Sequence, residues 1–158
     1  MLLYVICALL GVGLIALDQW VKWWVVTNIA YPGGGTLPFL PHVLGLSHTR
    51  NTGAAWSILS GHTWILTAVS ILAALVILYV LVRRKLRHPW GVISLAVVLA
   101  GAVGNLIDRI RLGYVVDMFQ TLFMDFPVFN VADICVTCCG AAFVIYFAFF
   151  YEKWEKKS

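Results

Sequence analysis

The sequence predicts an all-α membrane protein with four transmembrane helices and a small extracytoplasmic β element between the first and second helices. Of its 158 residues, 62% are hydrophobic and only 11% are charged, whereas a typical soluble domain has about 25% charged residues. The apolar residues gather in four stretches, each close to the roughly 20 residues that a helix needs to cross a bilayer core. We expect a single integral membrane domain over residues 1–158.

The four predicted spans cover about residues 2–26, 64–82, 90–108 and 132–151. The first span has no Lys or Arg before its apolar core. Asp18, Gln19 and Lys22 stand where a signal-peptide cleavage site would need small residues. We therefore expect the first span to be a retained anchor.

Basic residues indicate the orientation, because cytoplasmic loops carry an excess of Lys and Arg. Residues 83–88 and 152–158 lie on one side of the membrane and hold seven basic residues: Arg83, Arg84, Lys85, Arg87, Lys153, Lys156 and Lys157. Residues 27–63 and 109–130 lie on the other side and hold three: Arg50, Arg109 and Arg111. Both termini are therefore predicted to be cytoplasmic. No basic face is interleaved with polar residues, so the sequence does not favour nucleic-acid binding.

Two segments would then face outward, residues 27–63 and 109–130. The first is rich in Pro and Gly, which are loop residues. Residues 43–49 have the pattern of a short strand. Residues 51–53 have the pattern of a turn between this strand and residues 54–58. We expect a small sheet on the outer membrane surface.

The metal-binding residue types do not form a recognisable site. The four cysteines lie in apolar runs, without a second Cys or His pair at ligand spacing: Cys7, Cys135, Cys138 and Cys139. Three histidines lie in the first outer segment, at a spacing that matches no common metal motif: His42, His48 and His62. We expect buried, unpaired thiols, no metal and no cofactor.

Polar residues gather at the end of the third span. At helical spacing Gly101, Asn105, Asp108 and Arg109 share one face, and the glycine allows another helix to approach closely. Taken alone, these polar residues indicate an interhelical hydrogen-bond cluster with an Asp108–Arg109 pair. Asp18 and Lys22 in the first span have the spacing of an i,i+4 ion pair at the membrane surface.

Asp117 and Asp133 are the main catalytic candidates, because a carboxylate in an apolar membrane chain is costly. Asp133 follows Asn130 in the pattern of a capping box, so it also has a structural role available. Asp117 lies between apolar neighbours without a visible cap, and such surroundings raise the pKa of a carboxyl. One neutral and one ionised carboxyl, or a pair sharing one proton, is the aspartic-protease arrangement.

Five motifs together resemble the lipoprotein signal peptidases, or signal peptidase II, of bacteria. The resemblance covers nearly the whole chain, although Trp56 and Met118 stand where the family often has Phe. The motifs are Asp18–Lys22, Arg50–Trp56, Gly104–Arg109, Val115–Asp117 and Phe129–Asp133.

The resemblance implies a membrane aspartyl endopeptidase without metal or cofactor. Such enzymes remove the signal peptide from diacylglyceryl-modified prolipoproteins by cutting before the lipidated cysteine. It also implies that Asp117 and Asp133 form the dyad. The other implied site residues line the site, hold the substrate backbone or support the architecture: Asn51, Asn105, Arg109, Asn130, Asp18, Lys22, Asp108 and Gly53. The implied partners are the prolipoprotein and membrane lipid, and we expect a monomer.

Three alternatives remain open. A proton-coupled transporter also needs intramembrane acids, but such proteins usually contain repeats and broken helices. A Ser–Lys protease would use Ser47 or Ser57 with Lys22, whose neighbour Asp18 would keep the lysine protonated. A purely structural scaffold has no need for Asp117 in an apolar segment.

Overall fold

The computed structural model describes residues 1–53 and 59–155. Residues 54–58 of the second motif, and Lys156 and Lys157 of the basic tail, lie outside the described residues. The elements in chain order are α1 (Leu2–Asn28), β1 (Leu37–Leu40), β2 (Leu44–Asn51), α2 (Thr63–Val82), α3 (Pro89–Leu112), β3 (Val115–Thr121), α4 (Val131–Phe149) and α5 (Tyr151–Glu155).

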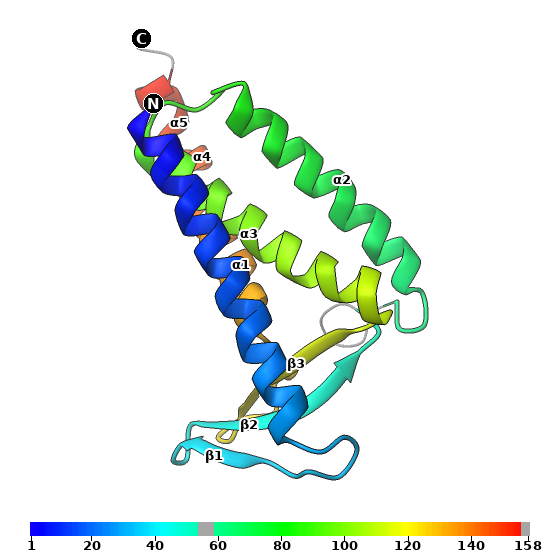
Figure 1. Ribbon diagram of the computed structural model, residues 1–158. Helices are drawn as coiled ribbons and strands as arrows, with labels where there is room; N and C mark the ends of the chain where they lie inside the picture. The colour runs from blue at the N-terminus through cyan, green and yellow to red at the C-terminus, as the bar shows by residue number, and fades with distance from the viewer. Residues whose placement is uncertain (54–58, 156–158) are drawn as a thin grey trace.

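Four of these helices, α1 to α4, are long and apolar enough to cross a membrane, which confirms the predicted number of spans. Their ends differ from the predicted spans by a few residues. The fourth helix ends at Phe149 rather than Tyr151, because the chain leaves helical geometry at Phe150 before the short α5 begins. The start of α1 and the short helix α5 lie at the same end of the helical bundle (Figure 1).

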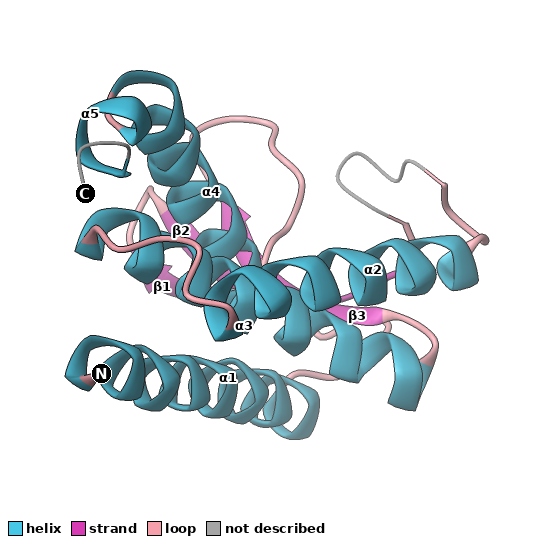
Figure 2. Ribbon diagram, turned by 90° about the horizontal axis from the view of Figure 1, so that it is seen from above, coloured by secondary structure: helices cyan, strands magenta, loops and turns pink. Residues whose placement is uncertain are grey.

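Helix α3 is the central helix of the bundle and packs against α1, α2 and α4 (Figures 1 and 2). Small residues permit this packing. A methyl group added at Gly101 would lie 2.5 Å from the carbonyl oxygen of Ala132, the second residue of α4. A methyl group added at Gly104 would lie 2.8 Å from a carboxylate oxygen of Asp18. The glycine predicted to allow a close helix approach therefore has that role.

Helix α2 stands apart from the other helices. It packs mainly against α3, and none of its residues is buried (Figure 1). Its ridge of apolar side chains therefore faces lipid on most sides, which explains why it has the most uniformly apolar sequence of the four helices.

The sheet lies at the end of the bundle opposite the chain termini (Figure 1). Its three antiparallel strands have the order β1-β2-β3. The β element predicted between the first two spans supplies β1 and β2. The third strand, β3, comes from the segment between α3 and α4 and was not predicted. Thr49 pairs with Asp117, and Asn51 with Val115, so β2 brings Asn51 close to Asp117.

Apolar packing holds β3 against the first helix. Val116 and Met118 of β3 are buried together with Val25 of α1 and with Ile29, which follows it. Because Asp117 lies between two fully buried residues of this strand, the backbone around its carboxyl is held from both sides.

Candidate active site

Asp117 lies in the middle of β3 and is only 1% exposed. Its Oδ1 accepts a hydrogen bond of 2.6 Å from Nδ2 of Asn130, and its Oδ2 accepts one of 2.9 Å from Nδ2 of Asn51. Burial, and then the negative charge of Asp133, raise the pKa of Asp117 to about 7. The hydrogen bonds from the two amides oppose this rise without cancelling it.

Asp133 lies in the first turn of α4 and forms the predicted capping box with Asn130. Oδ1 of Asn130 accepts from the backbone N–H of Asp133 at 2.9 Å, and the backbone N–H of Asn130 donates to Oδ2 of Asp133 at 3.1 Å. The other oxygen, Oδ1, accepts from Nδ2 of Asn105 at 2.7 Å. The capping role does not remove Asp133 from the site, since its side chain lines the same cavity as Asp117.

The two acids are brought together by a cavity of about 250 Å³. Its walls include four of the predicted site residues besides the two acids, and apolar residues of the segment before α4. The lining residues are Asn51, Gly53, Asn105, Arg109, Val115, Asp117, Phe126, Pro127, Val128, Phe129, Asp133 and Thr137. Thr137 and the 126–129 segment were not predicted, because nothing in their sequence distinguishes them from ordinary helix and loop residues.

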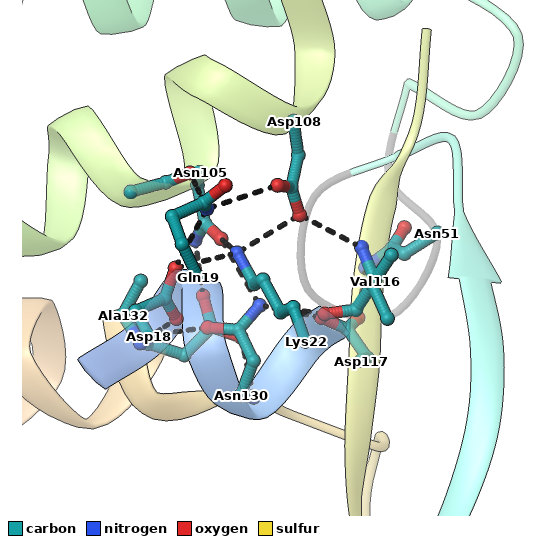
Figure 3. A network of polar contacts seen from close by, with 12 residues as sticks. Asp18, Gln19, Lys22, Asn51, Asn105, Asp108, Val116, Asp117, Asn130 and Ala132 are labelled. Atoms are coloured by element: carbon teal, nitrogen blue, oxygen red, sulfur yellow. Dashed lines mark hydrogen bonds and ion pairs between the residues drawn. The ribbon is translucent and has the colours of Figure 1, made fainter. Parts of the chain in front are cut away.

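Lys22 fixes the orientation of the amides between the two acids. Its Nζ donates to Oδ1 of Asn105 at 2.9 Å, and Nδ2 of Asn130 donates to the same oxygen at 3.0 Å. An ammonium group has no acceptor. The oxygen of Asn105 must therefore face Lys22, and its Nδ2 faces Asp133. Figure 3 shows Lys22 among Asp18, Asn105 and Asp108, with Asn130 and Asp117 beside this cluster.

Lys22 also joins two acids outside the cavity. Its Nζ lies 2.9 Å from Oδ2 of Asp18 and 2.9 Å from Oδ2 of Asp108. The predicted Asp18–Lys22 pair is therefore present. This pair is buried inside the protein, since the two side chains are 2% and 3% exposed. The predicted Asp108–Arg109 pair is replaced by Asp108–Lys22, since Asp108 points toward α1 on the buried side of α3.

Asp18 and Asp108 also accept hydrogen bonds from the backbone of the residues that precede the two candidate catalytic acids. Oδ1 of Asp18 accepts from the backbone N–H of Ala132 at 2.9 Å, and Oδ2 of Asp108 accepts from that of Val116 at 3.1 Å (Figure 3). Ala132 and Val116 immediately precede Asp133 and Asp117. Asp18, Lys22 and Asp108 thus support the positions of both candidate acids without lining their cavity.

Gln19 completes this cluster and was not predicted as a site residue. Its Nε2 donates to Asp108 Oδ1 at 3.1 Å, to Asp18 Oδ2 at 3.2 Å and to the Gly104 carbonyl at 3.2 Å. A polar amide next to Asp18 in an otherwise apolar span was the available signal.

Arg109 reaches the cavity from the last turn of α3. Its Nη2 donates to the carbonyl oxygen of Gly53 at 3.5 Å, and its Nε is buried without a hydrogen-bond partner among the residues that the structure describes. Asn51 fixes the other side of Gly53, because its Oδ1 accepts from the Gly53 N–H at 2.8 Å. The side-chain amides of Asn51, Asn105 and Asn130 all make hydrogen bonds within the protein.

A second, more polar cavity of about 610 Å³ adjoins the first. Asn51, Asp117 and residues 126–128 line both cavities, while Arg50 and Asp125 belong to the second only. The carboxyl of Asp117 is therefore reached from two differently lined spaces.

The described part of the chain contains no group of three or more His, Cys, Asp or Glu side chains arranged to hold a metal ion. The four cysteines are unpaired thiols. The polar groups that converge on Asp117 and Asp133 are amide and backbone donors, which suit two carboxyl groups.

Comparison with known proteins decides the family. A family model described as signal peptidase (SPase) II matches residues 10–150. The chain belongs to the signal peptidase II family. It is 49% identical over 131 residues to the lipoprotein signal peptidase of Enterococcus faecalis, which covers 83% of this chain and 80% of that protein. It is 46% identical over 138 residues to the lipoprotein signal peptidase of Latilactobacillus sakei, covering 87% and 88%.

Two solved structures of bacterial membrane enzymes share this fold. A bacterial membrane enzyme determined by the in meso method at 2.3 Å resolution superimposes with a TM-score of 0.83 at 30% identity, covering 96% of this chain and 92% of that one. A second bacterial membrane enzyme structure, at 1.9 Å resolution, gives 0.81 at 30% identity, covering 91% and 93%. The comparisons give the transporter alternative no support, and the predicted membership of the signal peptidase II family is confirmed.

Proposed function

We propose that this signal peptidase is an aspartic endopeptidase in which Asp117 and Asp133 form the catalytic dyad. One observation carries the proposal. Two carboxyl groups line one cavity of about 250 Å³, and both oxygens of each are held by hydrogen-bond donors of the protein. Such preorganisation is what acid–base catalysis by two carboxyls requires.

The chemistry assigns different roles to the two acids. Asp133 is the ionised member and takes a proton from a water molecule, whose oxygen then attacks the scissile carbonyl carbon. Asp117, whose pKa lies near 7, is neutral and donates its proton to the carbonyl oxygen. The tetrahedral gem-diol then collapses: Asp117 recovers a proton from one hydroxyl, Asp133 delivers its proton to the leaving amide nitrogen, and the C–N bond breaks.

The substrate is a diacylglyceryl-modified prolipoprotein, cut immediately before its lipidated cysteine. The names of the curated relatives, lipoprotein signal peptidase, support this substrate class. Arg109 supports it chemically, because its buried Nε is a donor without a described partner beside the cavity and suits a substrate carbonyl oxygen. The polar second cavity suits the polypeptide that follows the cysteine.

The distribution of basic residues supports an active site at the outer face of the cytoplasmic membrane. Arg83, Arg84, Lys85 and Arg87 connect α2 to α3 at the end of the bundle where both termini lie, whereas the sheet is at the other end (Figure 1). An excess of basic residues favours the cytoplasmic side. A single chain supplies both acids and their donors, which supports a monomeric enzyme.

The dyad is tested by cleavage of a diacylglyceryl-modified prolipoprotein by detergent-purified enzyme. We expect Asp117→Asn and Asp133→Asn each to lower the rate by about 10²–10⁴-fold, the usual contribution of a general acid or base. Asp125→Asn is the matched control. Asp125 is exposed and lines only the neighbouring cavity, so this variant removes the same charge nearby.

Wild-type rates in either dyad variant would exclude the assignment. Two additions to the assay test the rest of the proposal. EDTA should leave the rate unchanged, whereas a loss of activity would point to a metal. Prolipoprotein without the diacylglyceryl group should be cleaved poorly, and equal cleavage would remove the lipid from the specificity.

A further inference from the structure

Helices α1, α2 and α3 surround an apolar groove of about 420 Å³ near the termini, on the far side of α3 from the candidate dyad. Small side chains form its floor: Ala8 and Gly11 on α1, and Ala96 and Ala100 on α3. Larger residues such as Leu78 on α2 form a wall. Helix α2 stands apart from α1 (Figure 1), and the small side chains of α1 and α3 leave the groove open between these helices.

The rim of this groove carries a fixed positive charge. Arg84 lines the groove, and its guanidinium carbon lies 5.6 Å from the centre of the Tyr4 ring. Tyr4 is itself held, since its hydroxyl donates to the carbonyl oxygen of Leu86 at 2.5 Å. The φ of 48° at Arg84 belongs to the left-handed turn that ends α2, in which the Arg84 N–H donates to the carbonyl oxygen of Leu81 and the Lys85 N–H to that of Val80.

We propose that this groove binds an anionic phospholipid, with one acyl chain between α1 and α2 and the phosphate on Arg84. The apolar floor matches the acyl chain, and the arginine forms charge-assisted hydrogen bonds to phosphate oxygens. A signal peptide is a poorer occupant, because its N-terminal region is positively charged and Arg83 and Arg84 would repel it. The site is separate from the dyad and does not depend on the proposed catalytic mechanism.

Binding is measured on the full-length protein taken from vesicles of equal palmitoyl-oleoyl phosphatidylglycerol and phosphatidylcholine. Native mass spectrometry in mild detergent then counts the lipids that remain bound. We expect wild type to retain phosphatidylglycerol over phosphatidylcholine by about fivefold, the factor that corresponds to about 1 kcal/mol for one basic side chain near a membrane surface. Arg84→Gln should remove this preference, and Arg84→Lys should keep it.

Arg83→Gln is the matched control, because it removes the same charge from the neighbouring residue, which does not line the groove. Lys85 is unsuitable as a control, since it lines a second groove of about 330 Å³ between α2 and α4. Ala8→Trp fills the floor without touching the charge, and it should lower the retention of both lipids.

Three outcomes would overturn the proposal. Wild type could retain the two lipids equally. Arg83→Gln could lose as much preference as Arg84→Gln, which would indicate a general surface charge effect. Bound phosphatidylglycerol could be displaced by an excess of a synthetic signal peptide, which would assign the groove to the peptide.

Discussion

The side-chain amide of Asn130 donates to Asp117 at 2.6 Å while its oxygen caps the backbone N–H of Asp133, so one residue contacts both candidate acids. Asn130 is fully buried, and a second hydrogen bond to Asn105 fixes which way its amide faces. The N-cap of α4 and the hydrogen-bond donor to Asp117 are therefore the same side chain.

Two substitutions of Asn130 separate these roles. Serine is a good N-cap residue, but its hydroxyl is too short to replace the amide at Asp117. We expect Asn130→Ser to keep more of the wild-type melting temperature than Asn130→Ala does, because the cap remains, and to lower cleavage about 10- to 100-fold. Asn130→Ala should lower both, with about 1 kcal/mol lost from the cap alone. If the serine variant cleaves at the wild-type rate, the amide has no role in catalysis.

The rate should depend on pH through Asp117. Because the proposed mechanism needs this carboxyl neutral and its pKa is about 7, we expect kcat/KM to fall about tenfold per pH unit above 7. Asn51→Ala removes a donor that favours the ionised form, so the falling limb should move to higher pH. Initial rates between pH 5 and 9 measure both effects. A rate that rises with pH through 7 would reverse the roles of the two acids.

Folding stability should also depend on Asp117. Its pKa is about 7 when folded and 3.8 in the reference state, so the folded protein holds the extra proton between these values. The contribution of Asp117 to stability is therefore greatest at low pH and decreases as pH rises toward 7, by up to about 1.4 kcal/mol per unit. Thermal unfolding of Asp117→Asn at pH 5 to 8 should show a flatter pH dependence than wild type. An unchanged slope would mean that Asp117 titrates normally.

Lys22 should be more important for folding than for chemistry. Lys22→Met leaves Asp18 and Asp108 buried without a counter-charge, and we expect a loss of about 3–5 kcal/mol. Adding Asp108→Asn to Lys22→Met removes one of the uncompensated charges and should recover part of the loss. Thermal unfolding of the two single variants and the double variant forms a double-mutant cycle. Strictly additive losses would argue against the buried ion pair.

The helices and the capping box could be predicted because each depends on residues that are close together in the sequence. The four apolar stretches gave the helices within a few residues, and Asn130 with Asp133 gave the capping box before its geometry was known. The small sheet was predicted in part. Strand β3 was missed because Val115 to Met118 are all buried, which removes the alternation of apolar and polar residues that identifies a strand.

Long-range contacts could not be read from the sequence. Asp18 bonds to the backbone of Ala132, 114 residues away, and Asp108 is turned toward Lys22 rather than toward its neighbour Arg109. A helix-face argument cannot distinguish these partners, because it describes only one helix. The same limit explains why Gln19, which contacts both acids of this cluster, was not predicted as a site residue.

The contact between Asp18 and Ala132 has a consequence for biosynthesis. Helix α1 leaves the ribosome before α4 and carries Asp18 and Lys22 into the membrane as a ready-made ion pair, which lowers the energy of inserting either charge. The start of α4 is made more than 100 residues later, and only its arrival gives Asp18 its backbone partner at Ala132 and brings Asp133 to the cavity of Asp117. A nascent chain therefore cannot bring the two candidate acids together until α4 has been inserted.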